Sequence, residues 1–159
     1  MTDLETLIET EKIKKLRILY SHHFDMNELD KMIALFTSDA ICEFGSRGTC
    51  VGHAQMREVF EYAHEFWDKN KRGTYPYVHA ITNHWIEFTG PESAEGRCYL
   101  IDMAMCQEQS PLLLIGAYDD EYKKVDGQWL IHRTRIDYLW PERAVTGGFP
   151  GKRIPAAVS

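Results

Sequence analysis

Apolar residues recur at every third or fourth position in the first part of the chain. This spacing predicts a helix from residue 4 to residue 24, with Thr2 or Asp3 as its N-cap. The stretch Met26-Asn27-Glu28 interrupts the pattern. A second, shorter helix is expected over residues 29–36, ending at Thr37-Ser38-Asp39. The stripe of the first helix consists of Leu4, Leu7, Ile8, Ile13, Leu16, Leu19, Tyr20 and Phe24.

The pattern changes after the second helix. Residues 41–45 alternate in polarity and predict a short strand, and Gly45 to Gly52 then reads as a hairpin. Helical spacing returns over residues 53–67. From Thr74 onward the chain is rich in β-branched and aromatic residues, which favour strands. The turn signals Gly90-Pro91 and Asp126-Gly127 help to divide this part into four long strands, over residues 75–89, 94–107, 112–125 and 129–140.

This order of elements predicts an α+β domain, in which helices cover one face of a mixed, mostly antiparallel sheet. With 159 residues the chain is expected to form one domain. We assign residues 1–145 to that domain. Residues 146–159 contain Gly and Pro and form an irregular C-terminal tail.

Composition and charge narrow the function classes. An apolar fraction of 44% and a charged fraction of 26% are typical of a globular protein. The formal charge of −6 argues against binding to nucleic acid or to an anionic membrane surface. No apolar run approaches the ~18–20 residues of a membrane span, and the N-terminus does not read as a signal peptide. We therefore expect a cytoplasmic protein.

Cofactor chemistry is not indicated by any motif. The four cysteines lack C-x-x-C spacing and are interpreted as reduced thiols, with a Cys42–Cys50 disulfide left open for an oxidising compartment. His22 and His23 are adjacent and point in different directions on a helix, so they do not form a metal site. Phosphate-binding and dinucleotide-binding glycine motifs are absent from the sequence. We expect no metal and no cofactor.

Four motifs carry a resemblance that covers residues 5 to 140. They are Leu19-Tyr20 with Phe24-Asp25-x3-Leu29-Asp30, Gly52-His53-Ala54, His79-x3-Asn83, and Gly116-x-Tyr118-x-Asp120-x-Tyr122 followed by Asp126-Gly127-x-Trp129. On these motifs the chain resembles the SnoaL-like branch of the nuclear-transport-factor-2-like superfamily. The resemblance implies a strongly curved sheet that about three N-terminal helices close into a cone with an internal pocket. It also implies that the tail can act as a lid on that pocket.

Asp25 and His79 match the Asp–His dyad of the dehydratases and dehydrochlorinases in this family. The resemblance makes His79 the base that removes a proton from carbon, and Asp25 its partner. Histidine suits this role because its pKa lies near working pH, and an aspartate fixes its tautomer. Tyr20 matches a tyrosine that acts on the leaving group. The alternatives are a helix-capping Asp25, a structural His79 and a Tyr20 that belongs to the apolar stripe.

The last strand supplies further candidates. Its period of two places Trp129, Ile131, Arg133, Arg135 and Asp137 on one face and Leu130, His132, Thr134, Ile136 and Tyr138 on the other. By resemblance the second set faces the cavity, so we expect His132, Thr134 and Tyr138 to contact substrate, together with Tyr77 and Tyr118. Family members carry an arginine where this chain has Thr134 and Tyr138. Arg133 or Arg135 could replace it if the register slips by one residue. Otherwise these two arginines form ion pairs in a subunit interface.

The resulting hypothesis is a cofactor-independent lyase. It would remove a C–H proton and a hydroxyl group from a cyclic apolar substrate such as a steroid, a polyketide or an aromatic-derived ring. A ring isomerase or an aldol cyclase would use the same base. A non-catalytic assembly subunit, such as the small subunit of a ring-hydroxylating dioxygenase, is the alternative from another class. We expect a homodimer or homotrimer.

Overall fold

The computed structural model describes residues 1–68, 71, 73, 77–104 and 112–141. The proposed C-terminal tail and lid therefore lie outside the described residues. The chain forms three α-helices, α1 (Asp3–Asp25), α2 (Leu29–Ile33) and α3 (Gly52–Trp67), and a 3-10 turn, η1 (Gly45–Arg47). Helix α1 begins at a capping box, in which Thr2 Oγ1 accepts from Glu5 N–H at 3.2 Å and Glu5 Oε2 accepts from Thr2 N–H at 2.7 Å.

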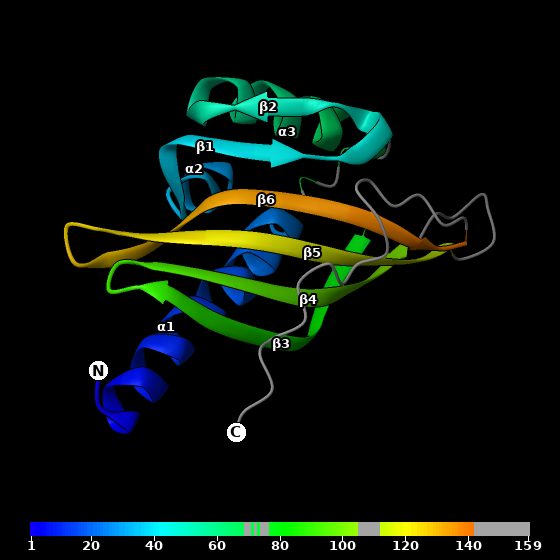
Figure 1. Ribbon diagram of the computed structural model, residues 1–159. Coiled ribbons are helices and arrows are strands. Elements are labelled where there is room, and N and C mark those ends of the chain that lie inside the picture. Colours follow the sequence, from blue (N-terminus) through cyan, green and yellow to red (C-terminus); the bar gives the residue numbers. More distant parts are fainter. Residues whose placement is uncertain (69–70, 72, 74–76, 105–111, 142–159) are drawn as a thin grey trace.

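The helices pack on a six-stranded sheet (Figure 1). The strands are β1 (Phe36–Glu43), β2 (Thr49–Val51), β3 (Tyr77–Gly90), β4 (Ser93–Ala104), β5 (Leu112–Val125) and β6 (Gln128–Trp140). Their order is β2-β1-β6-β5-β4-β3, and only the β1–β6 pair is parallel among the described strands. The α+β class and the mixed, mostly antiparallel sheet are thus confirmed. The sheet itself stays open rather than closing into a barrel.

One boundary differs from the sequence expectation. The apolar run that contains Leu35 and Phe36 was assigned to the second helix, but α2 ends at Ile33 and β1 begins at Phe36. The cause is tertiary, because the backbone N–H of Ile131 in β6 donates to the Leu35 carbonyl at 2.9 Å. A short apolar run fits a helix or a buried strand equally well, and here pairing with β6 decides the outcome.

A β-bulge in β6 has a direct consequence for the site. Tyr122 of β5 pairs with Ile131, whereas the preceding Glu121 pairs with Arg133, so His132 is an extra residue in the ladder. The bulge reverses the alternation of side chains. Ile131 faces the core before it, and Thr134 faces the core after it.

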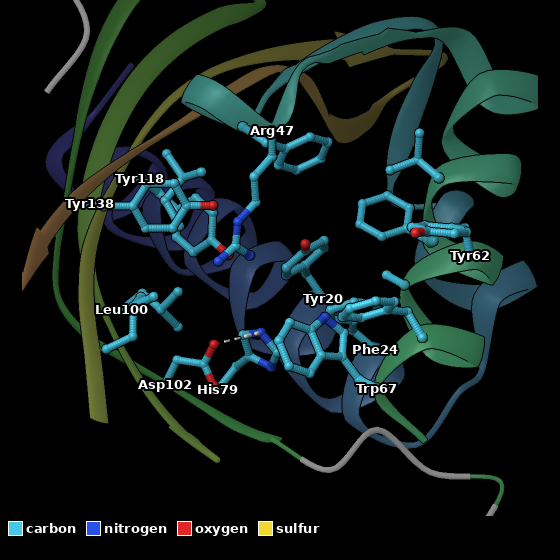
Figure 2. Close-up of a pocket in the computed structure, with 17 residues that line it drawn as sticks. Tyr20, Phe24, Arg47, Tyr62, Trp67, His79, Leu100, Asp102, Tyr118 and Tyr138 are labelled. Carbon is cyan, nitrogen blue, oxygen red and sulfur yellow. Dashed lines mark ion pairs between the residues drawn. The ribbon is translucent and has the colours of Figure 1, made fainter. Parts of the chain in front are cut away.

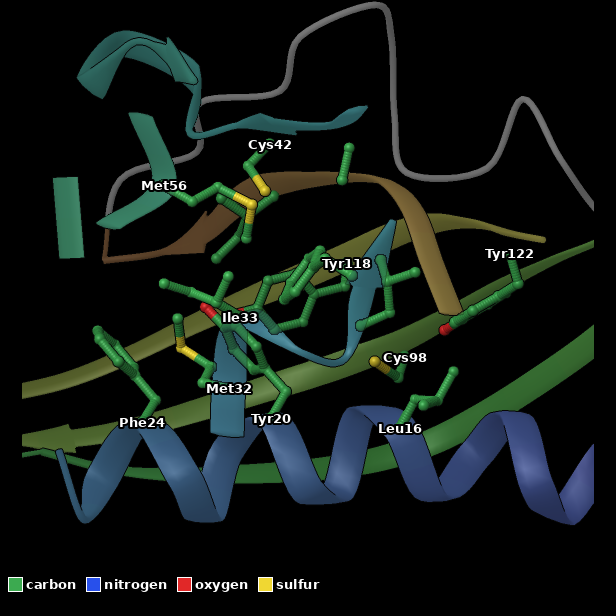
Figure 3. Packing of buried hydrophobic residues seen from close by; sticks show 14 of the residues in the cluster. Leu16, Tyr20, Phe24, Met32, Ile33, Cys42, Met56, Cys98, Tyr118 and Tyr122 are labelled. Carbon is green, nitrogen blue, oxygen red and sulfur yellow. The ribbon is translucent and has the colours of Figure 1, made fainter. Parts of the chain in front are cut away.

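The core lies between the inner face of the sheet and the helices (Figure 3). Helix α1 contributes one buried stripe to it, which is Ile13, Leu16, Tyr20 and Phe24. Cys42 and Cys50 are register partners on β1 and β2, and both thiols are free and buried, as is Cys98. The disulfide left open by the sequence is therefore not formed in this structure.

Candidate active site

A cavity of about 520 Å³ lies against the inner face of the sheet (Figure 2). Helices α1 and α3 and turn η1 supply part of its wall, and strands β3 to β6 supply the rest. The wall is mainly aromatic and aliphatic, which suits a flat apolar ligand. Its aromatic members are Tyr20, Phe24, Phe44, Phe60, Tyr62, Phe66, Trp67, Tyr118 and Tyr138.

Asp25 and His79 meet at this cavity. Asp25 is the last residue of α1, and His79 lies near the start of β3, which contacts α1. His79 Nδ1 lies 2.5 Å from Asp25 Oδ1, and the backbone N–H of His79 donates to Asp25 Oδ2 at 3.0 Å. An ionised carboxylate only accepts hydrogen bonds, so Nδ1 is the donor and the neutral ring keeps Nε2 as its acceptor. The His79 side chain lines the cavity and is 6% exposed.

Asp102 is a second carboxylate at the same histidine. It pairs with His79 in the β3–β4 ladder, and its Oδ2 lies 3.8 Å from His79 Nε2. Burial raises the pKa of Asp102 to about 6, and its Oδ1 is buried without a hydrogen-bond partner among the described residues. Asp102 is not among the site residues predicted from the sequence. A signal was present, because Asp102 continues the alternation of Cys98 and Leu100 and so places an acid on the buried face of a strand.

Two of the predicted tyrosines line the cavity beside a buried cation. The rings of Tyr20 and Tyr118 pack edge to face with centroids 6.2 Å apart. The Arg17 guanidinium carbon lies 4.8 Å from the Tyr20 centroid and 4.0 Å from the Tyr118 centroid. Burial raises the pKa of both hydroxyls well above its ordinary value. Both tyrosines therefore stay neutral and able to donate hydrogen bonds.

Arg47 is the one arginine or lysine among the described residues that line the cavity, and it was not predicted from the sequence. It belongs to η1, in the β1–β2 hairpin, where Gly45 and Gly48 have φ values of 59° and 104° that favour glycine. Its guanidinium carbon lies 5.0 Å from the centroid of the Tyr138 ring. Tyr138 itself lines the cavity as expected. The sequence signal for Arg47 was weak, because a hairpin arginine is most often solvent-exposed, and Arg47 is exposed even though it lines the cavity.

His132 does not line the cavity, which corrects the sequence expectation. The expected face assumed unbroken alternation along the last strand, and the bulge at His132 breaks it. Its ring bonds instead to Thr37 Oγ1 at 3.0 Å and to Lys123 Nζ at 2.8 Å. These contacts lie outside the residues that line the cavity.

Thr134 and Arg135 are also absent from the described cavity wall. Thr134 faces inward as expected, but its hydroxyl donates to Asp120 Oδ1 at 2.6 Å and accepts from Arg17 at 2.7 Å. Arg135 points to the other face of the sheet, where it pairs with Asp119 at 3.1 Å. Arg135 therefore forms an ion pair within the chain and does not line the cavity, and its expected place in a subunit interface stays a prediction. The side chain of Tyr77 lies outside the described residues.

A separate buried polar cluster joins α1 to the sheet beyond the cavity. Arg17 and Asp120 are both fully buried and form a two-bond ion pair. Tyr122 O–H donates to Asp120 Oδ2 at 2.8 Å and also contacts His84 Nε2 at 3.2 Å. His84, Cys98 and Asp120 have ligand atoms within 4.8 Å of one another. A metal ion does not suit this group, because it would share Asp120 with the Arg17 guanidinium.

The fold and cavity define a small α+β domain that encloses a ligand pocket with a His–Asp pair. The SnoaL-like domain family matches residues 5–135, so the chain belongs to that family. No curated protein matches the chain. In the described part of the chain, no helix has the length and apolar character needed to cross a membrane.

Solved structures share this fold over most of their length. A putative scytalone dehydratase from Novosphingobium aromaticivorans DSM 12444 is 27% identical, with a TM-score of 0.78 over 97% of this chain and 99% of that one. A putative aromatic ring hydroxylase from Novosphingobium aromaticivorans is 28% identical, with a TM-score of 0.70 over 84% and 92%. A hexachlorocyclohexane dehydrochlorinase, LinA-type3 from Novosphingobium barchaimii LL02, is 18% identical, with a TM-score of 0.73 over 91% and 99%. This last likeness concerns the fold alone.

Proposed function

We propose that the protein is a cofactor-independent lyase that dehydrates a cyclic apolar substrate, with His79 as its base. The observation that carries the proposal is the orientation of the His79 ring. Nδ1 is bonded to Asp25, so Nε2 is left as the proton acceptor of a side chain that lines an aromatic cavity. A base held in one tautomer, on a side chain that is itself almost fully buried, is suited to removing a proton from carbon.

The reaction is an elimination. Nε2 of His79 takes the proton from a carbon next to a carbonyl group, and the electrons of that C–H bond form an enolate. The enolate collapses to a carbon–carbon double bond as the C–O bond to the hydroxyl group breaks. The departing oxygen accepts the proton that His79 removed and leaves as water, so His79 returns to its neutral form. Proton removal next to a carbonyl group is favoured because the enolate delocalises the charge.

Asp25, Asp102 and Tyr20 support these steps. The transient imidazolium is stabilised by Asp25 at Nδ1 and by Asp102 on the Nε2 side. Tyr20 is proposed to donate a hydrogen bond to the departing oxygen. Burial holds the Tyr20 proton firmly, since it raises the pKa of the hydroxyl above its ordinary value. Tyr20 is therefore suited to polarising the C–O bond rather than to giving up its proton.

The shape and lining of the cavity support a ring-containing substrate. Steroid, polyketide and aromatic-derived rings all present flat apolar faces that stack on aromatic side chains. An isomerase or an aldol cyclase would form the same enolate and would differ only in the reaction that the enolate undergoes next. The similarity to the putative scytalone dehydratase from Novosphingobium aromaticivorans DSM 12444, at 27% identity, favours dehydration. A purely structural subunit would not need a buried Asp102 carboxylate beside His79.

Turnover of a panel of cyclic β-hydroxy ketones tests the proposal. Product formation is followed by the absorbance of the conjugated enone and by loss of water in mass spectrometry. His79→Gln is expected to lower kcat by about a hundredfold or more, as removal of a general base does. His22→Gln is the matched control, because His22 is exposed on α1. Equal rates in wild type and His79→Gln would refute the role of His79 as the base.

We also propose that copies of the chain associate through the other face of the sheet. Val78, Met103 and Leu113 are register partners on β3, β4 and β5, and each side chain is exposed. Such an apolar strip across three strands is typical of a subunit contact. A homodimer or homotrimer built through it would leave the cavity, which lies against the inner face, free to bind substrate.

A further inference from the structure

We infer that Arg47 binds a negatively charged oxygen of the substrate, and so selects ring compounds that carry a carboxylate or that form an enolate in the pocket. The inference rests on the proposed function, because it assigns the substrate class and its orientation in the same site. It concerns a residue of η1, which packs on Tyr138 of β6 but does not belong to that strand, where the resemblance places the family's arginine.

Arg47 supplies the permanent positive charge of the cavity. Among the described lining residues it is the one lysine or arginine, while the rest of the wall is aromatic, aliphatic or carries His79 and Asp102. Figure 2 shows its side chain reaching from the hairpin into the space between Tyr138 and Tyr20. No described carboxylate forms an ion pair with Arg47. The contact that the structure shows is the stack on the Tyr138 ring, at 5.0 Å.

The stack leaves the hydrogen-bonding edge of the guanidinium available. An arginine that lies over an aromatic ring uses its face for the cation–π contact, and its N–H groups point outward in the guanidinium plane. Those N–H groups form a planar fork that matches a carboxylate or an enolate oxygen. The turn fixes the backbone of Arg47 beside this ring, because the Arg47 N–H donates to the Phe44 carbonyl at 3.1 Å.

The charges of the cavity lie in two groups. Asp25 and Asp102 flank His79, whereas Arg47 stacks on Tyr138, near enough to Asp102 that its positive charge opposes the rise that burial causes in the pKa of that carboxyl. An anionic oxygen is repelled from the carboxylates and attracted to the guanidinium. The substrate therefore binds with its charged oxygen at Arg47, which leaves an adjacent ring C–H directed at His79. This arrangement supplies the electrostatic stabilisation of an enolate that elimination requires.

Two pairs of probes distinguish a carboxylate that the substrate carries from an enolate that forms in the pocket. Naphthoate and naphthamide have similar shapes and differ in charge, so they report on a carboxylate carried by the substrate. Para-nitrophenolate and para-nitroanisole report in the same way on an enolate-like oxygen, at a pH where the phenol is ionised. Binding of each probe is measured by calorimetry to wild type, Arg47→Gln, Arg47→Lys and Arg133→Gln. The last is a matched control, because it removes an arginine that pairs with Glu43 and lies outside the cavity wall.

Wild type is expected to bind at least one anion about tenfold more tightly than its neutral partner, the size of one charge-assisted hydrogen bond. Arg47→Gln is expected to abolish that preference, Arg47→Lys to retain part of it, and Arg133→Gln to leave it unchanged. If Arg47→Gln loses only the preference for naphthoate, the substrate carries a carboxylate. If it loses only the preference for the phenolate, the charged oxygen is that of an enolate. An unchanged preference in Arg47→Gln, or no preference in wild type, overturns the inference.

The same variants separate this inference from the lyase proposal. His79→Gln is expected to abolish turnover and to leave the anion preference intact, because His79 does not contact the charged oxygen. An Arg47-dependent preference in a protein that eliminates water from no ring substrate would refute the lyase proposal alone. If turnover is lost in His79→Gln but the anion preference is unchanged in Arg47→Gln, this inference alone is refuted.

Discussion

Replacing Asp102 by asparagine is expected to make the protein more stable at neutral pH. The carboxyl is buried beside His79, and burial raises its pKa from the ordinary value of 3.8 to about 6. At neutral pH it is ionised in both the folded and the unfolded chain, so the folded chain bears the desolvation of the charge. A pKa difference of this size corresponds to about 3 kcal/mol. An asparagine amide is still polar, so the expected gain is about 1–3 kcal/mol.

The sign follows from proton linkage. A carboxyl whose pKa is raised by folding contributes stability below its unfolded value of 3.8 and loses it as pH rises through about 6. Asp102→Asn removes this dependence, so the variant exceeds wild type at neutral pH and the difference shrinks as pH falls through that window. Groups far from Asp102 affect both proteins equally and cancel in the comparison, whereas His79, at 3.8 Å, interacts with this carboxyl and contributes to the difference.

Urea unfolding at several pH values measures the difference. With a slope of ~2 kcal/mol per molar urea, the midpoint is expected to rise by about 0.5–1.5 M at neutral pH. Glu58→Gln is the matched control: Glu58 is exposed on α3, and an exposed change of this kind stays within ~0.5 kcal/mol. A destabilised Asp102→Asn protein, or a difference that does not vary with pH, would refute the assignment of Asp102 as a buried, uncompensated acid.

Three other predictions concern the rest of the molecule. Asp120→Asn is expected to destabilise the fold by about 3–5 kcal/mol in urea unfolding, because it leaves Arg17 buried without its counter-charge; a loss below ~1 kcal/mol would contradict this. His84 is expected to stay neutral in an NMR titration down to a pH of about 4, since burial lowers its pKa from 6.5, and stability is therefore lost as pH falls between those values; titration near 6.5 would contradict the burial. Met103→Asp is expected to shift the protein to monomer in light scattering while the fold stays intact, and an unchanged mass would exclude the proposed contact.

Most of the fold could be predicted from the sequence, since its long elements carry strong periodicity and marked turns. Asp126-Gly127 separates β5 from β6 as expected, and both residues have positive φ. The start of β1 at Phe36 could not be predicted in this way, because local pattern does not reveal a partner strand that lies far along the chain. The SnoaL-like family assignment, which rested on motifs spread from residue 5 to residue 140, is confirmed by the match to residues 5–135.

The candidate site was less accessible to sequence reasoning. The structure brings together Asp25 and His79, which are 54 residues apart, and only the resemblance had linked them. His132 was misplaced because a bulge, which leaves no clear mark in this sequence, reverses the faces of β6. Arg47 was missed because its role depends on how the hairpin closes over Tyr138. Asp102 could have been predicted from the sequence, since the alternation of side chains along β4 alone places this acid on the buried face.

The two buried polar clusters make opposite predictions for the same chemical change. Around Asp120 the carboxylate oxygens are fully used, by Arg17, Thr134 and Tyr122, so its charge is compensated and helps to hold α1 on the sheet. Around Asp102 one oxygen has no described partner, and His79 Nε2 lies at 3.8 Å, beyond hydrogen-bond distance. Buried groups left incomplete in this way reduce stability unless a ligand completes them. Aspartate-to-asparagine substitution should therefore weaken the fold at Asp120 and strengthen it at Asp102, and the second result would mean that this carboxylate serves the substrate rather than the fold.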